Sequence, residues 1–92
     1  MGKHFMDRVA AAADLQEEPI PGLPLVEIAG DRRVLVERHC GVTEYGRCRI
    51  CVRVKFGAVV IQGTQLELAR MTGEQLIVTG RIESVQLERS GR

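Results

Sequence analysis

The side chains of this sequence best suited to metal or redox chemistry are three cysteines and a histidine. Cys48 and Cys51 are three positions apart, and His39 and Cys40 lie just upstream. On a strand, residues i and i+3 point to opposite faces with Cα atoms about 10 Å apart, too far for a shared zinc ion or a disulfide. We therefore expect no metal, no cofactor and no disulfide, with Cys48 in the core and Cys51 on the surface.

The segment from His39 to Gly46 is the longest non-alternating stretch between the apolar runs. It could be a polar site on a loop, or a connector in which His39 and Tyr45 hydrogen-bond the backbone and glycines adopt positive φ. We favour the connector. The Cys40–His39 pair has no third residue to orient it, and Glu44 has no second carboxylate at a fixed spacing. We expect no catalytic residue, and so a protein that is not an enzyme.

A basic stripe follows this segment. The sequence between residues 47 and 56 alternates charged and apolar positions, so one face of a strand would carry Arg47, Arg49, Arg53 and Lys55 and the other would be core. The stripe could contact an acidic protein surface, nucleic acid or anionic lipid, or it could pair with Glu37 and other acidic residues on neighbouring strands. A protein partner is the better functional use, because three aromatic residues leave little for base stacking.

Composition limits the class of protein. The 92 residues suit one domain, and 13 Lys+Arg against 12 Asp+Glu leave no global field to attract nucleic acid or acidic lipid. Residues 31–56 are the exception, with seven basic and three acidic side chains. The hydrophobic share of 45% is that of a globular chain. The longest apolar run, residues 9–13, is too short for a membrane span, and we expect no signal peptide.

The elements that would position these side chains are mostly strands. Apolar residues recur every second position after residue 24, and the pattern predicts seven strands, over residues 25–29, 33–38, 47–56, 59–62, 65–68, 75–79 and 81–87. We predict an all-β domain over residues 24–92, a small antiparallel β-sandwich or roll. Residues 1–23 are predicted to form a short amphipathic helix, carrying Phe5 and Val9, and a Pro-rich connector.

Turn chemistry predicts two registers. A three-residue loop after Ala29 would place Ile28 opposite Val34, with apolar side chains on one face. A two-residue loop at Gly57-Ala58 would place Phe56 opposite Val59. The expected core comprises Ile50, Val52, Val54, Phe56 and Ile61.

An ordered set of motifs carries a family resemblance. Val34-Leu-Val-Glu-Arg-His39, Gly41-Val-Thr-Glu-Tyr45 and Gly80-Arg-Ile-Glu-Ser-Val85 flank the long alternating strand at characteristic separations. The chain resembles the YabP/YqfC family of sporulation proteins, in particular its YqfC branch. It departs from the family pattern at Arg38, where an Asn is expected before the His, and the cysteines are not family features.

The resemblance implies a small β-sandwich-like domain that acts in the mother cell of an endospore-forming bacterium, in spore envelope formation. It implies a cytoplasmic protein, or one peripheral to a membrane, with no catalytic residues and with protein partners that include a membrane-associated sporulation protein. From the residues we also expect unpaired strand edges, used by a second copy or by a partner's strand and assisted by the Phe5/Val9 helix. The alternative function is binding of nucleic acid or an anionic surface by the basic stripe.

Overall fold

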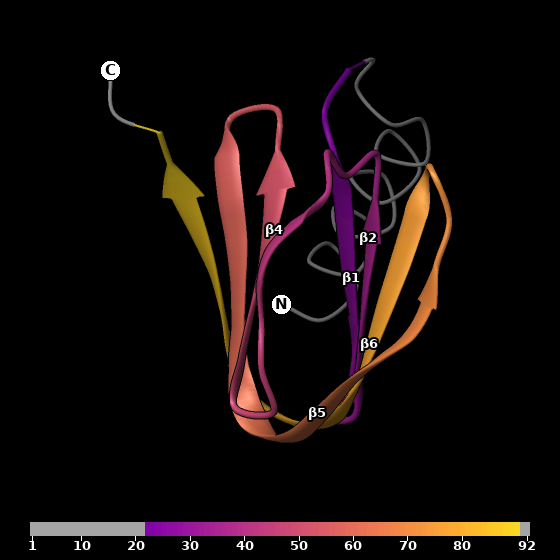
Figure 1. Ribbon diagram of the computed structural model, residues 1–92, viewed down its shortest axis with the longest axis vertical. Coiled ribbons are helices and arrows are strands. Elements are labelled where there is room, and N and C mark those ends of the chain that lie inside the picture. Colours follow the sequence, from indigo (N-terminus) through magenta and orange to yellow (C-terminus); the bar gives the residue numbers. More distant parts are fainter. Residues whose placement is uncertain (1–21, 91–92) are drawn as a thin grey trace, which may run out of the picture.

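The computed structural model describes residues 22–90, which form six strands and no helix. The strands are β1 (Leu25–Ala29), β2 (Arg33–Glu37), β3 (Val42–Tyr45), β4 (Arg49–Val54), β5 (Gly57–Met71) and β6 (Gln75–Arg89). They make one antiparallel sheet in the order β1-β2-β6-β5-β4-β3 (Figure 1). The all-β prediction is confirmed. The predicted helix lies outside the described residues.

The sheet bends sharply where β5 and β6 cross its middle. Both strands are 15 residues long, and their register shifts between Gln62 and Gly63 and again between Thr64 and Glu67. Figure 1 shows both strands turning at the bottom of the view, so that two halves of one sheet face each other. We expected separate strands here because Gly63 and Gly80 resemble turn residues. They instead allow a close approach of two backbones within continuous strands.

The strand count and architecture therefore differ from the prediction. The expected strands at 59–62 and 65–68 are parts of β5, and those at 75–79 and 81–87 are parts of β6. β3 was not expected, because its four residues fall in the segment assigned to a connector. The structure has a single folded sheet of six strands in place of a sandwich of about seven.

The core fills the space between the two halves. Its buried side chains come from β2, β4, β5 and β6, and they are Val34, Val36, Ile50, Val52, Val54, Val59, Ile61, Leu66, Leu76, Val78 and Ile82. Four of the five expected core residues are among them. The fifth, Phe56, is partly buried in the β4–β5 turn and packs against the cluster.

One predicted register is confirmed and the other is wrong. In the first hairpin Ile28 lies opposite Val34, as the three-residue loop requires. In the second, Val52 lies opposite Val59 and Val54 opposite Gly57, so the two-residue loop is Lys55-Phe56. The turn lies two residues earlier than predicted, so each residue of β4 faces a partner four positions away from the expected one. Such a shift keeps every apolar side chain on its face, so hydrophobic matching could not detect it.

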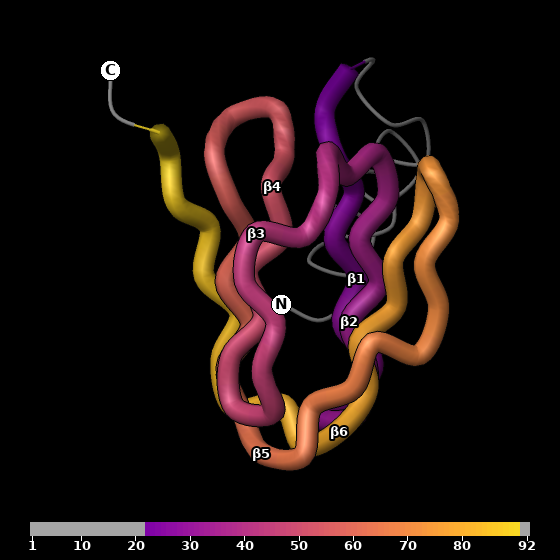
Figure 2. Tube along the Cα trace, in the orientation of Figure 1, coloured from indigo at the N-terminus to yellow at the C-terminus, as the bar shows by residue number. Residues whose placement is uncertain are grey.

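The β3–β4 turn closes the bent end of the sheet (Figure 2). Gly63 donates its N–H to the carbonyl of Cys48 at 3.1 Å, and Leu66 donates to the carbonyl of Arg47 at 2.8 Å. These bonds hold Arg47 and Cys48, which precede β4, against the bend in β5.

Candidate interaction surface

The four basic residues do not form one continuous stripe. Only Arg49 and Arg53 lie on β4, where both point to the outer face of the sheet. Arg47 precedes β4 in the β3–β4 turn, and Lys55 lies in the β4–β5 turn. β4 is therefore shorter than the predicted strand over residues 47–56, because Arg47 and Lys55 belong to turns. The four charges are spread over the two ends and the outer face of β4.

Glu44 neutralises one of these charges. The Nε of Arg49 donates to Oε1 of Glu44 at 3.1 Å, and the thiol of Cys51 donates to the same oxygen at 3.3 Å. The pairing brings β3 and β4 together, and both charged side chains remain partly accessible to solvent. Glu37, the alternative partner considered for the basic residues, does not pair with them in the described fold. It instead accepts a hydrogen bond from Nε2 of Gln75 at 2.8 Å, on the other half of the sheet.

The sequence prediction missed Glu44 as a partner because it missed β3. The Val-Thr-Glu-Tyr segment does not alternate apolar and polar residues, but Val42, Thr43 and Tyr45 are of types that favour strands, and this could have identified a short strand. A strand at Val42–Tyr45 next to the predicted β4 would have suggested a carboxylate beside the arginines.

The three groups of this cluster shift one another's pKa values. Hydrogen bonds from Cys51 and Arg49 lower the pKa of the Glu44 carboxyl, and the hydrogen bond that Arg49 donates to Glu44 raises the pKa of the Arg49 guanidinium. Burial raises the pKa of the Cys51 thiol, and its hydrogen bond to the carboxylate raises it further. Cys51 is therefore a protonated thiol at neutral pH, which is a poor nucleophile and a poor metal ligand.

The burial of Cys48 and Cys51 is the reverse of what was expected. Cys51 is 7% exposed, whereas Cys48 and Cys40 are exposed, and all three are free thiols. Cys51 does point to the outer face, but β4 lies inside the sheet and neighbouring side chains cover it. Cys48 precedes β4 and lies in the turn. Within residues 22–90 no three His, Cys, Asp or Glu side chains are grouped to hold a metal ion.

His39 has a structural role in the described fold. Its Nδ1 accepts the N–H of Gly41 at 3.0 Å, so Nε2 carries the proton and donates to the carbonyl of Thr72 at 2.8 Å. This bridge ties the β2–β3 connection to the β5–β6 turn. The connector prediction is confirmed for His39 and for Gly41, which has φ of +116°. It is wrong for Tyr45, which is 60% exposed on β3, and for Gly46, which lacks a positive φ.

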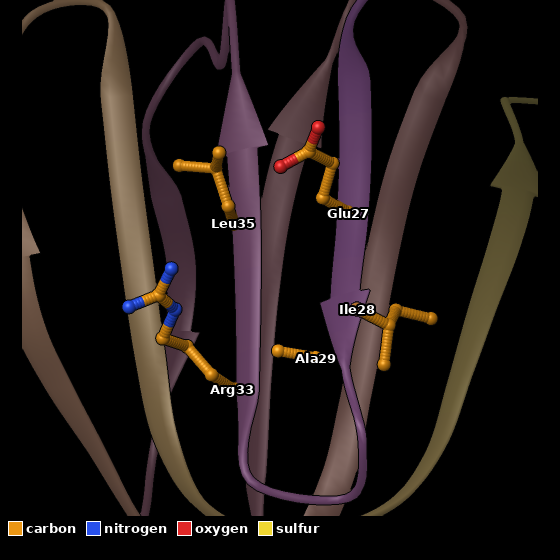
Figure 3. Close-up of a pocket in the computed structure, with 5 residues that line it drawn as sticks. All are labelled: Glu27, Ile28, Ala29, Arg33 and Leu35. Atoms are coloured by element: carbon orange, nitrogen blue, oxygen red, sulfur yellow. The ribbon is translucent and has the colours of Figure 1, made fainter.

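Two of the surface hollows in the described fold bear on the candidate interaction surface. One, of about 220 Å³, lies on the β1–β2 hairpin and is lined by Glu27, Ile28, Ala29, Arg33 and Leu35. Figure 3 shows Glu27 near Leu35 and Arg33 closer to the hairpin turn, with Ile28 pointing away to the side. The hollow thus presents one carboxylate and one guanidinium beside the apolar side chains of Ile28, Ala29 and Leu35.

The second hollow is the only one of the two with a net positive lining. It measures about 370 Å³ and is lined by Arg53, Val54, Lys55, Gly57 and Ser90. Within residues 22–90 neither Arg53 nor Lys55 forms an ion pair. Arg47 is likewise exposed without an ion pair among the described residues, but it lies at the other end of β4, so Arg53 and Lys55 are the two cations of the predicted basic face that share a hollow.

The fold and surface define a small all-β domain, in which the charged groups lie on sheet faces and turns around an apolar core. The YabP family model matches residues 24–92 of the chain. The chain therefore belongs to the YabP family, which confirms the resemblance inferred from its motifs. Membership of this family indicates a protein related to sporulation.

Comparisons outside the family model give no further relative. Neither the curated proteins nor the solved structures contain a match to the chain. In the part of the chain that the structure describes, no helix has the length and apolar character needed to cross a membrane.

Proposed function

We propose that the chain is a non-enzymatic sporulation protein that acts in the mother cell, in spore envelope formation, through contacts with other proteins. The observation that carries this proposal is membership of the YabP family over residues 24–92. A membrane-associated sporulation protein is the partner class that the family resemblance suggests. The chain would then act in the cytoplasm of the mother cell or at the periphery of a membrane.

Exposed apolar side chains support a role in protein contact. Four of the large ones lie on strand segments that have an unpaired side within the described fold: Ile28 on β1, Tyr45 on β3, Met71 at the end of β5 and Leu87 on the second half of β6. Their exposed fractions are 54%, 60%, 48% and 64%. Apolar side chains beside unpaired backbone groups are suited to recognition of another polypeptide.

Imaging and genetics in sporulating cells test this proposal. A fluorescent fusion of the full chain should appear in the mother cell and not in the forespore, and deletion of the gene should yield spores with a defective envelope. A fusion confined to the forespore, or a deletion strain with normal envelope layers and normal lysozyme resistance, would contradict it.

A pull-down addresses the protein contact itself. The full chain should retain specific proteins from sporulating cells, and Tyr45→Asp or Ile28→Asp should reduce recovery of a partner that uses the matching edge. Glu74→Gln, in the exposed β5–β6 turn, is a control that should leave recovery unchanged.

The second candidate function is binding of an anionic surface or nucleic acid. The hollow lined by Arg53 and Lys55 favours it, because both cations lack an ionic partner among the described residues. Titration with anionic vesicles and with DNA at two salt concentrations tests this function, since phosphate binding weakens steeply as salt rises. The double variant Arg53→Gln, Lys55→Gln should abolish such binding, whereas Arg32→Gln, Arg33→Gln, which removes the same charge elsewhere, should not.

A further inference from the structure

The second half of β6 has one unpaired side. β2 pairs with β6 only along Gln75–Thr79, and residues 81–89 pair with β5 alone. The β1–β2 turn covers just the beginning of this edge, where Ile82 donates its N–H to the carbonyl of Asp31 at 2.7 Å. In Figure 1 this segment is the outermost strand at the left. From Glu83 to Arg89, no strand among residues 22–90 pairs with its outer side.

The backbone groups on this side point outward. Ser90 donates its N–H to the carbonyl of Phe56 at 3.0 Å, which directs Ser90 toward β5. Because direction alternates along an antiparallel strand, Val85, Leu87 and Arg89 direct their N–H and C=O groups away from β5. The edge therefore offers a regular row of donors and acceptors.

Apolar side chains accompany these groups. Val85 lies opposite Ile61 and Leu87 opposite Val59, so both side chains are on the core side of the sheet. Leu87 is nevertheless 64% exposed, because it lies where this half of the sheet ends without a neighbour. A strand added here would continue the apolar face.

The other unpaired sides carry features that oppose pairing. β1 has Glu27 at its centre, which a symmetric pairing would place opposite its own copy, and like charges at that position repel. β3 has a register shift between Val42 and Glu44, and β5 has another between Leu68 and Arg70. Residues 84–89 of β6, in contrast, pair with β5 without a shift. Over residues 84–89 this edge therefore has no such shift within the described fold, and the nearest one lies at Glu83, which has no partner on β5.

We propose that the second half of β6 pairs with the same segment of a second copy of this chain, antiparallel, with the twofold axis at Gln86. In this register Val85 lies opposite Leu87 of the second copy, and Glu83 lies opposite Arg89. Both pairs occur twice across the axis, so apolar side chains meet and opposite charges meet. An axis at Val85 would instead place Arg81 opposite Arg89, with like charges opposed. The inference goes beyond the proposed function and does not depend on it.

The oligomeric state of the full chain tests the proposal. Light scattering and sedimentation at high micromolar concentration should give a dimer. Leu87→Pro removes an outward N–H and leaves a smaller apolar ring, a change that an edge strand tolerates, and should give a monomer with an unchanged far-UV spectrum. Leu87→Val keeps both the N–H and an apolar side chain, and should remain dimeric.

Crosslinking tests the register. With Cys40→Ser and Cys48→Ser as background, Gln86→Cys should form a disulfide-linked dimer with oxidised glutathione, because the two residues face each other at the axis. Glu88→Cys in the same background should not, since it would face Ser84. Charge reversal adds an independent check on register: Glu83→Arg and Arg89→Glu should each weaken the dimer several-fold, and together should restore it.

Three results would overturn the proposal. A full chain that remains monomeric excludes a second copy at this edge and leaves it to a strand of another protein. A dimer that Leu87→Pro does not dissociate uses a different surface. A dimer in which Gln86→Cys fails to crosslink, or in which the double charge reversal does not restore association, has a different register.

Discussion

Replacing Gly80 with alanine should destabilise the fold strongly, for two separable reasons. Gly80 has φ of +133°, a region that residues with a Cβ rarely adopt. A Cβ built there would also lie 2.5 Å from the carbonyl oxygen of Gln65, on the neighbouring strand β5. Rotating a side chain cannot relieve this overlap, because the opposing atoms belong to the backbone of the bend.

Three other glycines separate the two causes. Gly41 has φ of +116° but no atom within 4 Å of an added Cβ, so it reports backbone strain alone. Gly63 lacks a positive φ, but its Cβ would collide with the carbonyl oxygen of Arg81. Gly73 has neither feature and is the matched control.

The expected magnitudes follow from these environments. Strain alone should cost Gly41→Ala about 1 to 3 kcal/mol, and overlap alone should cost Gly63→Ala about 1 to 3 kcal/mol. Gly80→Ala combines both and should lose about 2 to 5 kcal/mol, a large part of the stability of a small domain. Gly73→Ala should gain about 0.4 to 1 kcal/mol, because alanine restricts the unfolded chain.

Urea unfolding followed by far-UV circular dichroism measures the free energy of unfolding of each variant. The reasoning fails if Gly80→Ala unfolds within about 0.5 kcal/mol of the parent, the range of a neutral surface change. It also fails if Gly73→Ala costs as much as Gly80→Ala, because the loss would then not depend on the bend.

Four further changes test other parts of the structure. Arg38 has φ of +62°, a conformation that asparagine tolerates better than arginine. Arg38→Asn should therefore raise the free energy of unfolding by about 0.5 to 1 kcal/mol, although it loses the hydrogen bond from the guanidinium to the carbonyl of Leu23. A fall in the free energy of unfolding by the same amount would contradict this. His39→Ala should cost about 1 to 3 kcal/mol in the same assay, because two hydrogen bonds between the β2–β3 connection and the β5–β6 turn disappear. A thiol reagent at neutral pH should label two cysteines promptly and Cys51 only after unfolding, and prompt labelling of three thiols would refute the burial argument. The lowered pKa of Glu44 adds stability that is fully present above the pKa of the unfolded chain and is lost as pH falls through the lower pKa of the folded chain. Glu44→Gln should therefore flatten the acid side of a stability–pH curve, and an unchanged curve would argue against it.

Local alternation predicted much of the fold. The apolar positions Ile50, Val52 and Val54 are buried as expected, and the first hairpin has the expected register. The bend was missed because Gly63 and Gly80 have the same local signature whether they end a strand or allow two strands to approach. Which of these occurs depends on pairing along the whole of β5 and β6, which local sequence does not reveal.

The surface was harder to predict than the core. The prediction that Cys51 points to the outer face was correct, but the burial of this side chain depends on side chains from other strands. Similarly, the charge of Arg49 was expected to be available, and its neutralisation by Glu44 depends on a strand that was not predicted. Positions on a strand follow from period two, whereas coverage and charge pairing require the order of strands in the sheet.

The order of strands has a consequence for how the chain folds. Among residues 22–90, four of the five strand pairings join neighbours in sequence, and only β2 with β6 joins distant segments, with Val34 opposite Val78. Each hairpin can therefore form early at a small cost in loop closure, while docking of the β1–β2 hairpin on β6 must wait for residues near the far end of the chain. During synthesis, the first hairpin would leave the ribosome well before its docking strand, with the apolar side of β2 exposed until β6 has been made.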